Sequence, residues 1–298
     1  MQTGGMFFTS KWSIFQLIPK EYYPSTILVH AEDKIEHIYQ QIKNASIEFP
    51  IIAKPDRGER GWGVKILYNK VELEYYKAKM NISFLVQAYV SYPIELSVFY
   101  YRNPNEKKGH VVSVTLKRLL SITGDGHSTI GHLILQNDRC FLQYKRLKKN
   151  NQINFSSVLQ KGEKQLLVPY GNHVLGATFI NYNRIIDEQL ISTIDKLSKR
   201  IDGFYYGRFD LRCTCIDDLK KGINFSILEI NGAASEPAHI YEPGFSFFKA
   251  QFTIARHFRI MYKIAKANHQ NGVAYMSYKS FLHTKKLERE YRLNANEN

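Results

Sequence analysis

The 298 residues suffice for one large or two modest domains, and 23% charged and 44% hydrophobic residues are ordinary for a soluble globular protein. Three cysteines are too few for a disulfide framework, no apolar run nears the roughly 18 residues of a membrane span, and residues 1–11 lack a signal pattern, so we expect a cytoplasmic protein. A net charge of +14 is typical of proteins that bind nucleic acid or an anionic membrane surface. The basic residues are scattered, however, so nucleic-acid binding is not expected, and a triphosphate substrate would account for part of the charge.

The first half of the chain is predicted to be rich in strands. Residues 1–11 are Gly-rich and expected to be irregular. In chain order, the expected elements are helices at 11–18, 32–45 and 70–80, and strands at 26–30, 50–55, 61–67, 84–89, 95–102 and 110–119.

The second half is predicted to alternate helices with two strands. The clearest amphipathic helix is 183–201, where an apolar stripe recurs at helical spacing. The remaining expected elements are helices at 128–136, 139–145 and 245–267, a charged helical tail from 279, and strands at 204–213 and 223–230. This order predicts a mixed α/β or α+β fold with a β-rich front lobe and a larger back lobe.

Two short segments near the end of the chain suggest a metal site. They are Arg208-Phe209-Asp210 and Glu229-Ile230-Asn231, each within an expected strand. Because side chains two apart on a strand share a face, pairing of these strands would gather a guanidinium, two carboxylates and an amide oxygen. Hard oxygen ligands beside a fixed cation suit Mg²⁺ that carries a phosphate-rich substrate. The alternative is two ordinary strands with polar outer faces.

A glycine-rich loop follows the strand that delivers Lys54. Its glycines, Gly58, Gly61 and Gly63, would let backbone N–H groups approach phosphate oxygens, while the lysine supplies a point charge. The P-loop pattern is absent, and the protein-kinase order, with the glycine loop before the lysine, is reversed here.

The strand that ends at Gln87–Val90 is a candidate for recognition of a base. A strand end leaves backbone groups free to contact an adenine edge, and Glu95, a few residues later, could accept both hydroxyls of a ribose. The alternative for Glu95 is a strand residue that faces solvent.

Taken in order, these features resemble the ATP-grasp superfamily, and most closely its D-alanine–D-alanine ligase and cyanophycin-synthetase-like carboxylate–amine ligases. The resemblance extends from about residue 11 to residue 243, and its most specific parts are GRFDLRC, LEINGAASEP and GDGHSTI. It implies an α+β ATP-grasp fold in which two lobes clasp ATP. It also implies an enzyme that transfers the γ-phosphoryl group of ATP to a carboxylate and then joins the acyl group to an amine.

The resemblance implies roles for individual residues. Lys54 and Lys11 would contact phosphates beneath a flap formed by residues 58–64. Main-chain groups of Gln87, Tyr89 and Val90 would contact adenine, and Glu95 the ribose. Either Lys117 or Arg118 would steady the γ-phosphate. Asp210, Glu229 and Asn231 would be ligands of two Mg²⁺ ions, and Arg208 would face the reacting carbonyl oxygen.

The resemblance also implies a division of the chain, without the full N-terminal domain of D-alanine–D-alanine ligases. We expect a remnant of that region at 1–30, a small lobe with the flap at 31–104, a large lobe with the metal site at 105–270, and a charged tail at 271–298.

The expected partners are a small-molecule carboxylate and an amine, such as an amino acid or a peptide; the oligomeric state stays open. Ser235, Glu236 and His239 are candidate substrate contacts. His173 is another, although a structural role in a turn is the alternative. Two other functions stay open: a peptide-tailoring ligase that acts on a protein or polymer end, and a catalytically inactive ATP-binding module.

Overall fold

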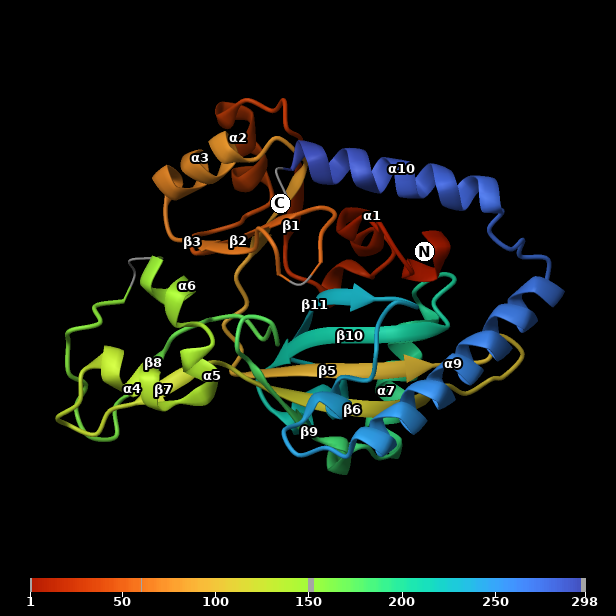
Figure 1. Ribbon diagram of the computed structural model, residues 1–298. Helices are drawn as coiled ribbons and strands as arrows, with labels where there is room; N and C mark the ends of the chain where they lie inside the picture. Colours follow the sequence, from red (N-terminus) through yellow and green to blue (C-terminus); the bar gives the residue numbers. More distant parts are fainter. Residues whose placement is uncertain (1, 60, 150–152, 296–298) are drawn as a thin grey trace.

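The computed structural model of the chain describes residues 2–59, 61–149 and 153–295 (Figure 1). Arg60, within the expected flap, lies outside these ranges. In the described residues every strand pair is antiparallel and helices cover the sheets, so the predicted α+β class is confirmed. None of the helices seen in these ranges is long and apolar enough to cross a membrane.

The small lobe is a four-stranded sheet covered on one face by two helices. Ile38 of one helix and Leu73 of the other pack on Ile51 and other buried residues of the sheet. Because side chains alternate along a strand, the opposite face presents Lys54 and Gln87. The elements are β1 (Thr26–Val29), β2 (Ile51–Pro55), β3 (Lys65–Leu67) and β4 (Phe84–Ala88), in the order β1-β4-β2-β3, with α2 (Ile35–Asn44) and α3 (Lys70–Lys79).

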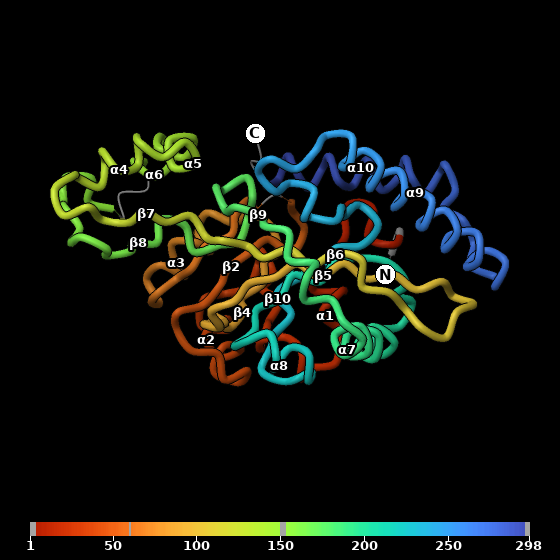
Figure 2. Tube along the Cα trace, turned by 90° about the horizontal axis from the view of Figure 1, so that it is seen from below, coloured from red at the N-terminus to blue at the C-terminus, as the bar shows by residue number. Residues whose placement is uncertain are grey.

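The large lobe is a five-stranded sheet between helices. Its strands are β5 (Ile94–Tyr101), β6 (His110–Arg118), β9 (Thr178–Asn181), β10 (Tyr206–Cys213) and β11 (Phe225–Asn231), in the order β11-β10-β5-β6-β9. Figure 2 shows α7 (Glu188–Lys199) on one side of this sheet and α9 (Phe247–Gln270) on the other. Phe209 and Leu211 pack toward α7 in the largest core, so Arg208, Asp210 and Arg212 face the opposite way.

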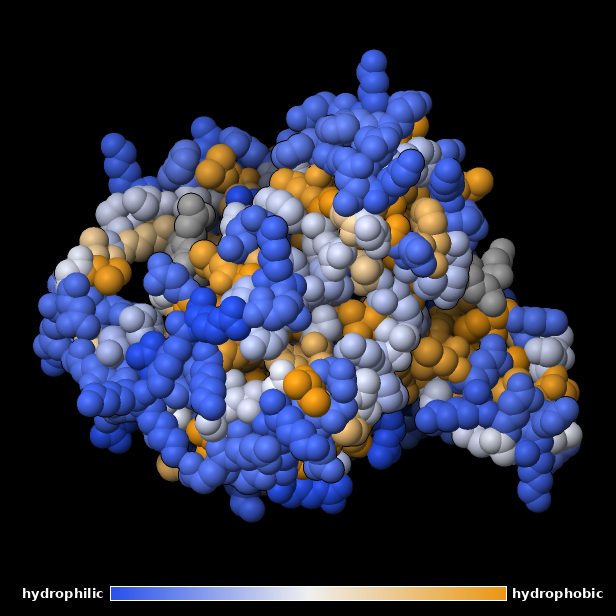
Figure 3. Space-filling model, turned by 180° about the vertical axis from the view of Figure 1, so that it is seen from behind, coloured by the Kyte–Doolittle hydropathy of each residue, from blue (hydrophilic) through white to orange (hydrophobic). Residues whose placement is uncertain are grey.

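Residues 120–149 and 153–168 form a third unit with a core of its own. Buried side chains such as Ile130, Ile134 and Cys140 pack together there, apart from the cores of the two sheets. Seen from behind, this unit projects from one side of the molecule (Figure 3). It contains β7 (Ser121–Thr123), β8 (Lys164–Leu166), α4 (Ile130–Gln136), α5 (Asp138–Phe141) and α6 (Tyr144–Lys149).

The N-terminal segment lies against the last helix of the chain. After α9, the chain crosses back along α10 (Tyr278–Asn294), which packs on the N-terminal segment beside η1 (Gln2–Gly5) (Figure 1). Phe7 meets Phe281 and Phe8 meets Tyr291 edge to face, each at 5.5 Å between ring centroids. The connecting elements are α1 (Lys11–Phe15), η2 (Lys20–Tyr22), η3 (Asn183–Ile185), α8 (Ile216–Lys221) and η4 (Ala238–Tyr241).

Most predicted elements are present with shorter bounds. The amphipathic helix expected at 183–201 begins at Glu188, because Asp187 caps it with a hydrogen bond to the backbone N–H of Leu190. The strand expected at 61–67 forms only over β3, because Gly61 and Gly63 adopt positive φ angles in a turn. The short elements β7, β8, β9 and α8 were not predicted.

A buried histidine anchors α9 to the sheet. The ring of His257 packs edge to face on Phe99 at 4.7 Å, and its Nδ1 lies 3.1 Å from the hydroxyl of Tyr206. Burial, reinforced by the positive charge of nearby His239 and Arg256, lowers the pKa of His257 to about 4.

This lowered pKa predicts a loss of stability in acid. In the unfolded chain the His257 ring takes up a proton near its ordinary pKa, whereas the folded protein resists protonation until about pH 4. The neutral ring therefore contributes stability that is complete above pH 6.5 and lost as the pH falls toward 4, by at most about 3 kcal/mol. Denaturant unfolding between pH 7 and pH 4 should show this slope, and His257→Gln should flatten it. An unchanged slope in the variant would contradict the assignment.

Candidate active site

The two strands expected to carry a metal site are paired. In their register Arg208 lies opposite Asn231 and Asp210 opposite Glu229. Arg208 donates from Nε to Oδ1 of Asp210 at 3.0 Å and from Nη2 to Oδ2 at 3.2 Å. Asn231 donates from Nδ2 to the same Oδ2 at 3.1 Å. The predicted convergence of these four side chains is confirmed; their chemical roles remain a proposal.

Asp210 is the buried centre of this group. Its Oδ1 accepts a hydrogen bond from Ser97 at 2.5 Å, and Nζ of Lys117 lies 3.4 Å from its Oδ2. Burial opposes ionisation of the carboxyl, but Arg208 and Lys117 outweigh that effect and hold its pKa at about 2. Asp210 is therefore a carboxylate at every physiological pH.

A second ion network adjoins the first on the same face of the sheet. Oε2 of Glu95 accepts from Nε and Nη2 of Arg212, both at 3.0 Å, and Nζ of Lys117 lies 3.4 Å from its Oε1. Glu95 is only 6% exposed, so the alternative of a residue that faces solvent is wrong. Arg212, which we did not predict, also donates to the carbonyl of Val90 at 2.8 Å. The sequence does indicate Arg212, because this residue follows Asp210 by two positions and so continues the alternation of polar side chains along the strand.

Lys54 connects the two lobes. Its ammonium donates to Oε1 of Gln87 at 2.9 Å in the small lobe and to the carbonyl of Leu228 at 3.0 Å in the large lobe. Burial lowers the pKa of Lys54 to about 8; Glu229 partly opposes this shift, and Lys11 adds to it. An anion beside this amine would favour its charged form.

Lys11 is held at the start of α1 by a capping arrangement. Ser10 accepts from the backbone N–H of Ser13 at 3.0 Å and donates to Asp56 at 2.9 Å, which places the helix start beside the glycine-rich loop. Nζ of Lys11 then donates to the carbonyl of Gly58 at 2.7 Å and lies 3.8 Å from Oε1 of Glu229.

The glycines of the loop are required by close contacts. A β-carbon at Gly61 would lie 2.7 Å from Nδ2 of Asn172, and one at Gly63 would lie 2.6 Å from Cγ of Pro55. Both residues also have positive φ angles. The loop therefore packs directly on β2 and on the segment that carries Asn172, over the face of Lys54.

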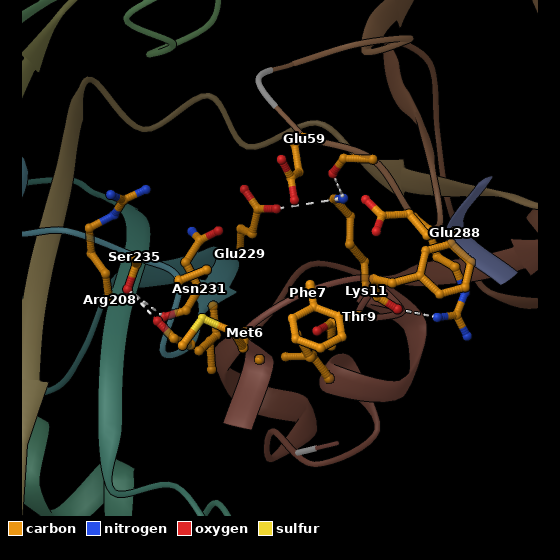
Figure 4. Close-up of a pocket in the computed structure, with 18 of the residues that line it drawn as sticks. Met6, Phe7, Thr9, Lys11, Glu59, Arg208, Glu229, Asn231, Ser235 and Glu288 are labelled. Carbon is orange, nitrogen blue, oxygen red and sulfur yellow. Dashed lines mark hydrogen bonds and ion pairs between the residues drawn. The ribbon is translucent and has the colours of Figure 1, made fainter. Parts of the chain in front are cut away.

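Two cavities meet at this group. The first, of about 400 Å³, lies between the Lys54 face of the small lobe and the charged face of the large lobe. The second, of about 370 Å³, lies between the N-terminal segment, α10 and the turn after β11 (Figure 4). In Figure 4, Glu229 extends toward Lys11, while Arg208, Asn231 and Ser235 come from the large lobe. The residues shared by both linings are Lys11, Gly58, Glu59, Arg208, Glu229 and Asn231.

The other predicted residues divide between the cavities and the surrounding structure. The first cavity is also lined by Gln87, Tyr89, Val90, Glu95, Lys117 and His173, and the second by Ser235 and Glu236. Three predicted residues line neither cavity: Gly63, Arg118 and His239. Arg118 is exposed, so of the basic pair only Lys117 faces the site. His239 is buried, with Nδ1 2.7 Å from Oγ of Ser113.

The donor set beside Arg208 fits Mg²⁺ in kind. Asp210, Glu229 and Asn231 offer two carboxylates and an amide oxygen, the hard ligands that this ion prefers. Only two of the three are acids, and no cluster of three His, Cys, Asp or Glu side chains suited to a metal occurs among the described residues. Water and phosphate oxygens normally complete the shell of Mg²⁺ at such sites.

The burial of Asp210 predicts a contrast between two candidate ligands. Asp210→Asn would leave Arg208 and Lys117 without their shared carboxylate and should destabilise the fold by about 3 kcal/mol or more. Glu229→Gln removes only the negative charge of a side chain that is 36% exposed, so its cost should stay under about 1 kcal/mol. Denaturant unfolding of both variants measures this difference. Equal losses would show that Asp210 is not the structural centre of the site.

Comparison with known proteins gives distant similarities of structure alone. No family profile matches the chain, and no curated protein is similar to it in sequence. The structure is similar to a D-alanine–D-alanine ligase from Bacillus anthracis at 14% identity and a TM-score of 0.46, over 89% of this chain and 68% of that one. It is similar to a D-alanine–D-alanine ligase from Coxiella burnetii at 11% identity and a TM-score of 0.47, over 97% and 62%.

A bifunctional glutathione synthetase from Pasteurella multocida is similar at 14% identity and a TM-score of 0.40, over 84% of this chain and 36% of that one. The chain thus spans about a third of the length of the synthetase and about three fifths of the Coxiella ligase. D-alanine–D-alanine ligases are also the proteins that the sequence motifs resemble. At identities and TM-scores this low, the similarities carry no functional argument.

Proposed function

We propose that this protein is an ATP-dependent ligase of the ATP-grasp superfamily that joins a carboxylate to an amine. One observation carries the proposal: two cavities of similar size share a wall at Arg208, Glu229 and Asn231. A nucleotide in one cavity and an acid in the other would meet at the residues best suited to phosphoryl transfer. The sequence motifs that resemble the superfamily supply these residues.

The first cavity suits ATP in its lining and charge. Apolar side chains such as Ile52 and Leu228 line it together with Tyr170, which suits a base, while Lys54 and Lys117 supply positive charge for phosphates. The buried network on the large lobe holds three cations, Arg208, Lys117 and Arg212, against the two carboxylates Asp210 and Glu95. An anionic ligand would balance this excess of positive charge.

Glu95 would bind the ribose and keep its ion pairs. Each carboxylate oxygen can accept more than one hydrogen bond, so Glu95 can hold Arg212 and still accept from ribose hydroxyls. Asp210, Glu229 and Asn231 would hold two Mg²⁺ ions, which neutralise phosphate charge when bound. Lys11 would contact the γ-phosphate end, where the two cavities join.

The second cavity would hold the acid. A carboxylate oxygen attacks the γ-phosphorus of ATP, the bond from that phosphorus to the β-phosphate oxygen breaks, and ADP and an acyl phosphate form. The amine then attacks the acyl carbon, the bond to phosphate breaks, and an amide, inorganic phosphate and a proton result. Such chemistry depends on positioning and charge more than on covalent help. Arg208, which lines both cavities, would stabilise the negative oxygen of the tetrahedral intermediate.

The first test of this function is a screen for ADP and product. With Mg·ATP, the protein should release ADP continuously only when the right acid and amine are both present among pooled amino acids and dipeptides. Mass spectrometry should then find a condensed product that has lost one water. Glu229→Gln is the matched control, because it should fold normally and release no ADP. ATP binding without turnover in any pool would instead support the inactive ATP-binding module.

Two arginines on one strand face should differ in their kinetic effects. Arg208 lines both cavities, whereas Arg212 lines only the first. Arg208→Lys should lower turnover by roughly 100-fold and leave Mg·ATP affinity nearly intact, by analogy with lost oxyanion donors. Arg212→Lys loses the paired contact with Glu95, so it should mainly weaken Mg·ATP binding. Steady-state kinetics and nucleotide titration separate the two effects, and a large loss of ATP affinity in Arg208→Lys would contradict its role.

A further inference from the structure

The outer face of α9 exposes aromatic side chains that have no role in the proposed catalysis. Each of them exposes between 61% and 82% of its surface. They are Phe247, Phe248, Phe252, Phe258 and Tyr262. We call this set the aromatic face of α9. Exposing so many rings on one element costs free energy in water and indicates a surface that another body covers.

The helical period places these rings opposite the attachment of α9 to the sheet. At about 100° per residue, the five rings fall within an arc of roughly 140°. His257 and Ile264, which pack with Phe99 and Tyr206, point the other way. In Figures 1 and 2, α9 runs along the periphery of the molecule.

One edge of the aromatic face is strongly basic. All 24 residues of α9 are described, and they include five basic side chains and no Asp or Glu. The basic residues are Lys249, Arg256, Arg259, Lys263 and Lys266, and all five are exposed. None of them forms a salt bridge within the described part of the chain. A row of uncompensated positive charge therefore lies beside the rings.

This charge decides between the possible occupants. Pairing with α9 of a second copy would set two rows of like charge against each other, which is unfavourable. Nucleic acid would satisfy the basic edge but would leave a face of phenyl rings without an apolar partner. An anionic bilayer satisfies both features, because lipid phosphates attract the cations while rings settle at the boundary of headgroups and acyl chains.

We propose that α9 docks the protein on the surface of an anionic phospholipid bilayer, lying in the plane of the interface with its aromatic face turned toward the lipid. The helix does not span the membrane. This inference rests on surface residues alone, so it stands or falls independently of the ligase function.

Vesicle co-sedimentation of the full chain tests the proposal. Vesicles of phosphatidylcholine mixed with phosphatidylserine should bind the protein, and vesicles of phosphatidylcholine alone should bind it far more weakly. A charge variant, Lys249→Gln with Arg259→Gln and Lys263→Gln, should lose roughly 100-fold in affinity for the anionic vesicles. An aromatic variant, Phe248→Ser with Phe252→Ser and Tyr262→Ser, should lose binding at least as strongly while its thermal unfolding stays unchanged.

The control removes exposed aromatic rings elsewhere. Tyr68→Ser with Tyr75→Ser deletes two rings of the small lobe that are 58% and 57% exposed, and vesicle binding should persist. Three outcomes would overturn the proposal: equal binding to both kinds of vesicle, no effect of either α9 variant, or no vesicle binding at all. Retention on DNA without vesicle binding would assign the face to nucleic acid. Dimerisation that the aromatic variant abolishes, again without vesicle binding, would assign it to a second copy.

Discussion

The two-residue period of the antiparallel sheet is the constraint on which the rest of the structure depends. Burying Phe209 and Leu211 against α7 forces Arg208, Asp210 and Arg212 onto one face. The neighbouring strands obey the same rule and add Glu95, Ser97 and Lys117 to that face. Each of these charges would be costly to bury alone. Because each strand places cations or anions beside opposite charges of the neighbouring strand, the buried charges on this face compensate one another.

Local patterns of the sequence predict this layer well. In the motif GRFDLRC, the alternating apolar residues predict a strand and the alternating charged residues predict the site. The same seven residues therefore predict both the fold and the chemistry. The two strands pair in antiparallel fashion, with α8 in the connection between them. Even so, sequence spacing could not choose between Lys117 and Arg118, since the choice depends on which residue of β6 shares the face of Glu95. That is a property of the register between strands.

Long-range contacts set the limit of prediction. Half of the wall of the second cavity comes from the two ends of the chain, joined by pairs such as Phe7 with Phe281 and Phe8 with Tyr291. Nothing local in either segment indicates its partner. His239 illustrates the same limit, because its closeness in sequence to the metal strand suggested a substrate contact. A one-turn helix instead turns its ring toward Ser113 and away from both cavities. The short strands β7, β8 and β9 escaped prediction because three or four residues carry too little periodicity.

The bond from Lys54 to the carbonyl of Leu228 has a mechanical consequence. This hydrogen bond connects the two lobes, and its donor is the same ammonium group that would bind a phosphate. An ammonium has three protons to donate, and two are already committed, one in each lobe. A single nitrogen atom therefore links the binding of an anion to the contact between the two lobes. Removing that nitrogen would weaken the contact between the lobes as well as the binding site, so a Lys54 variant changes lobe contact and anion binding at the same time.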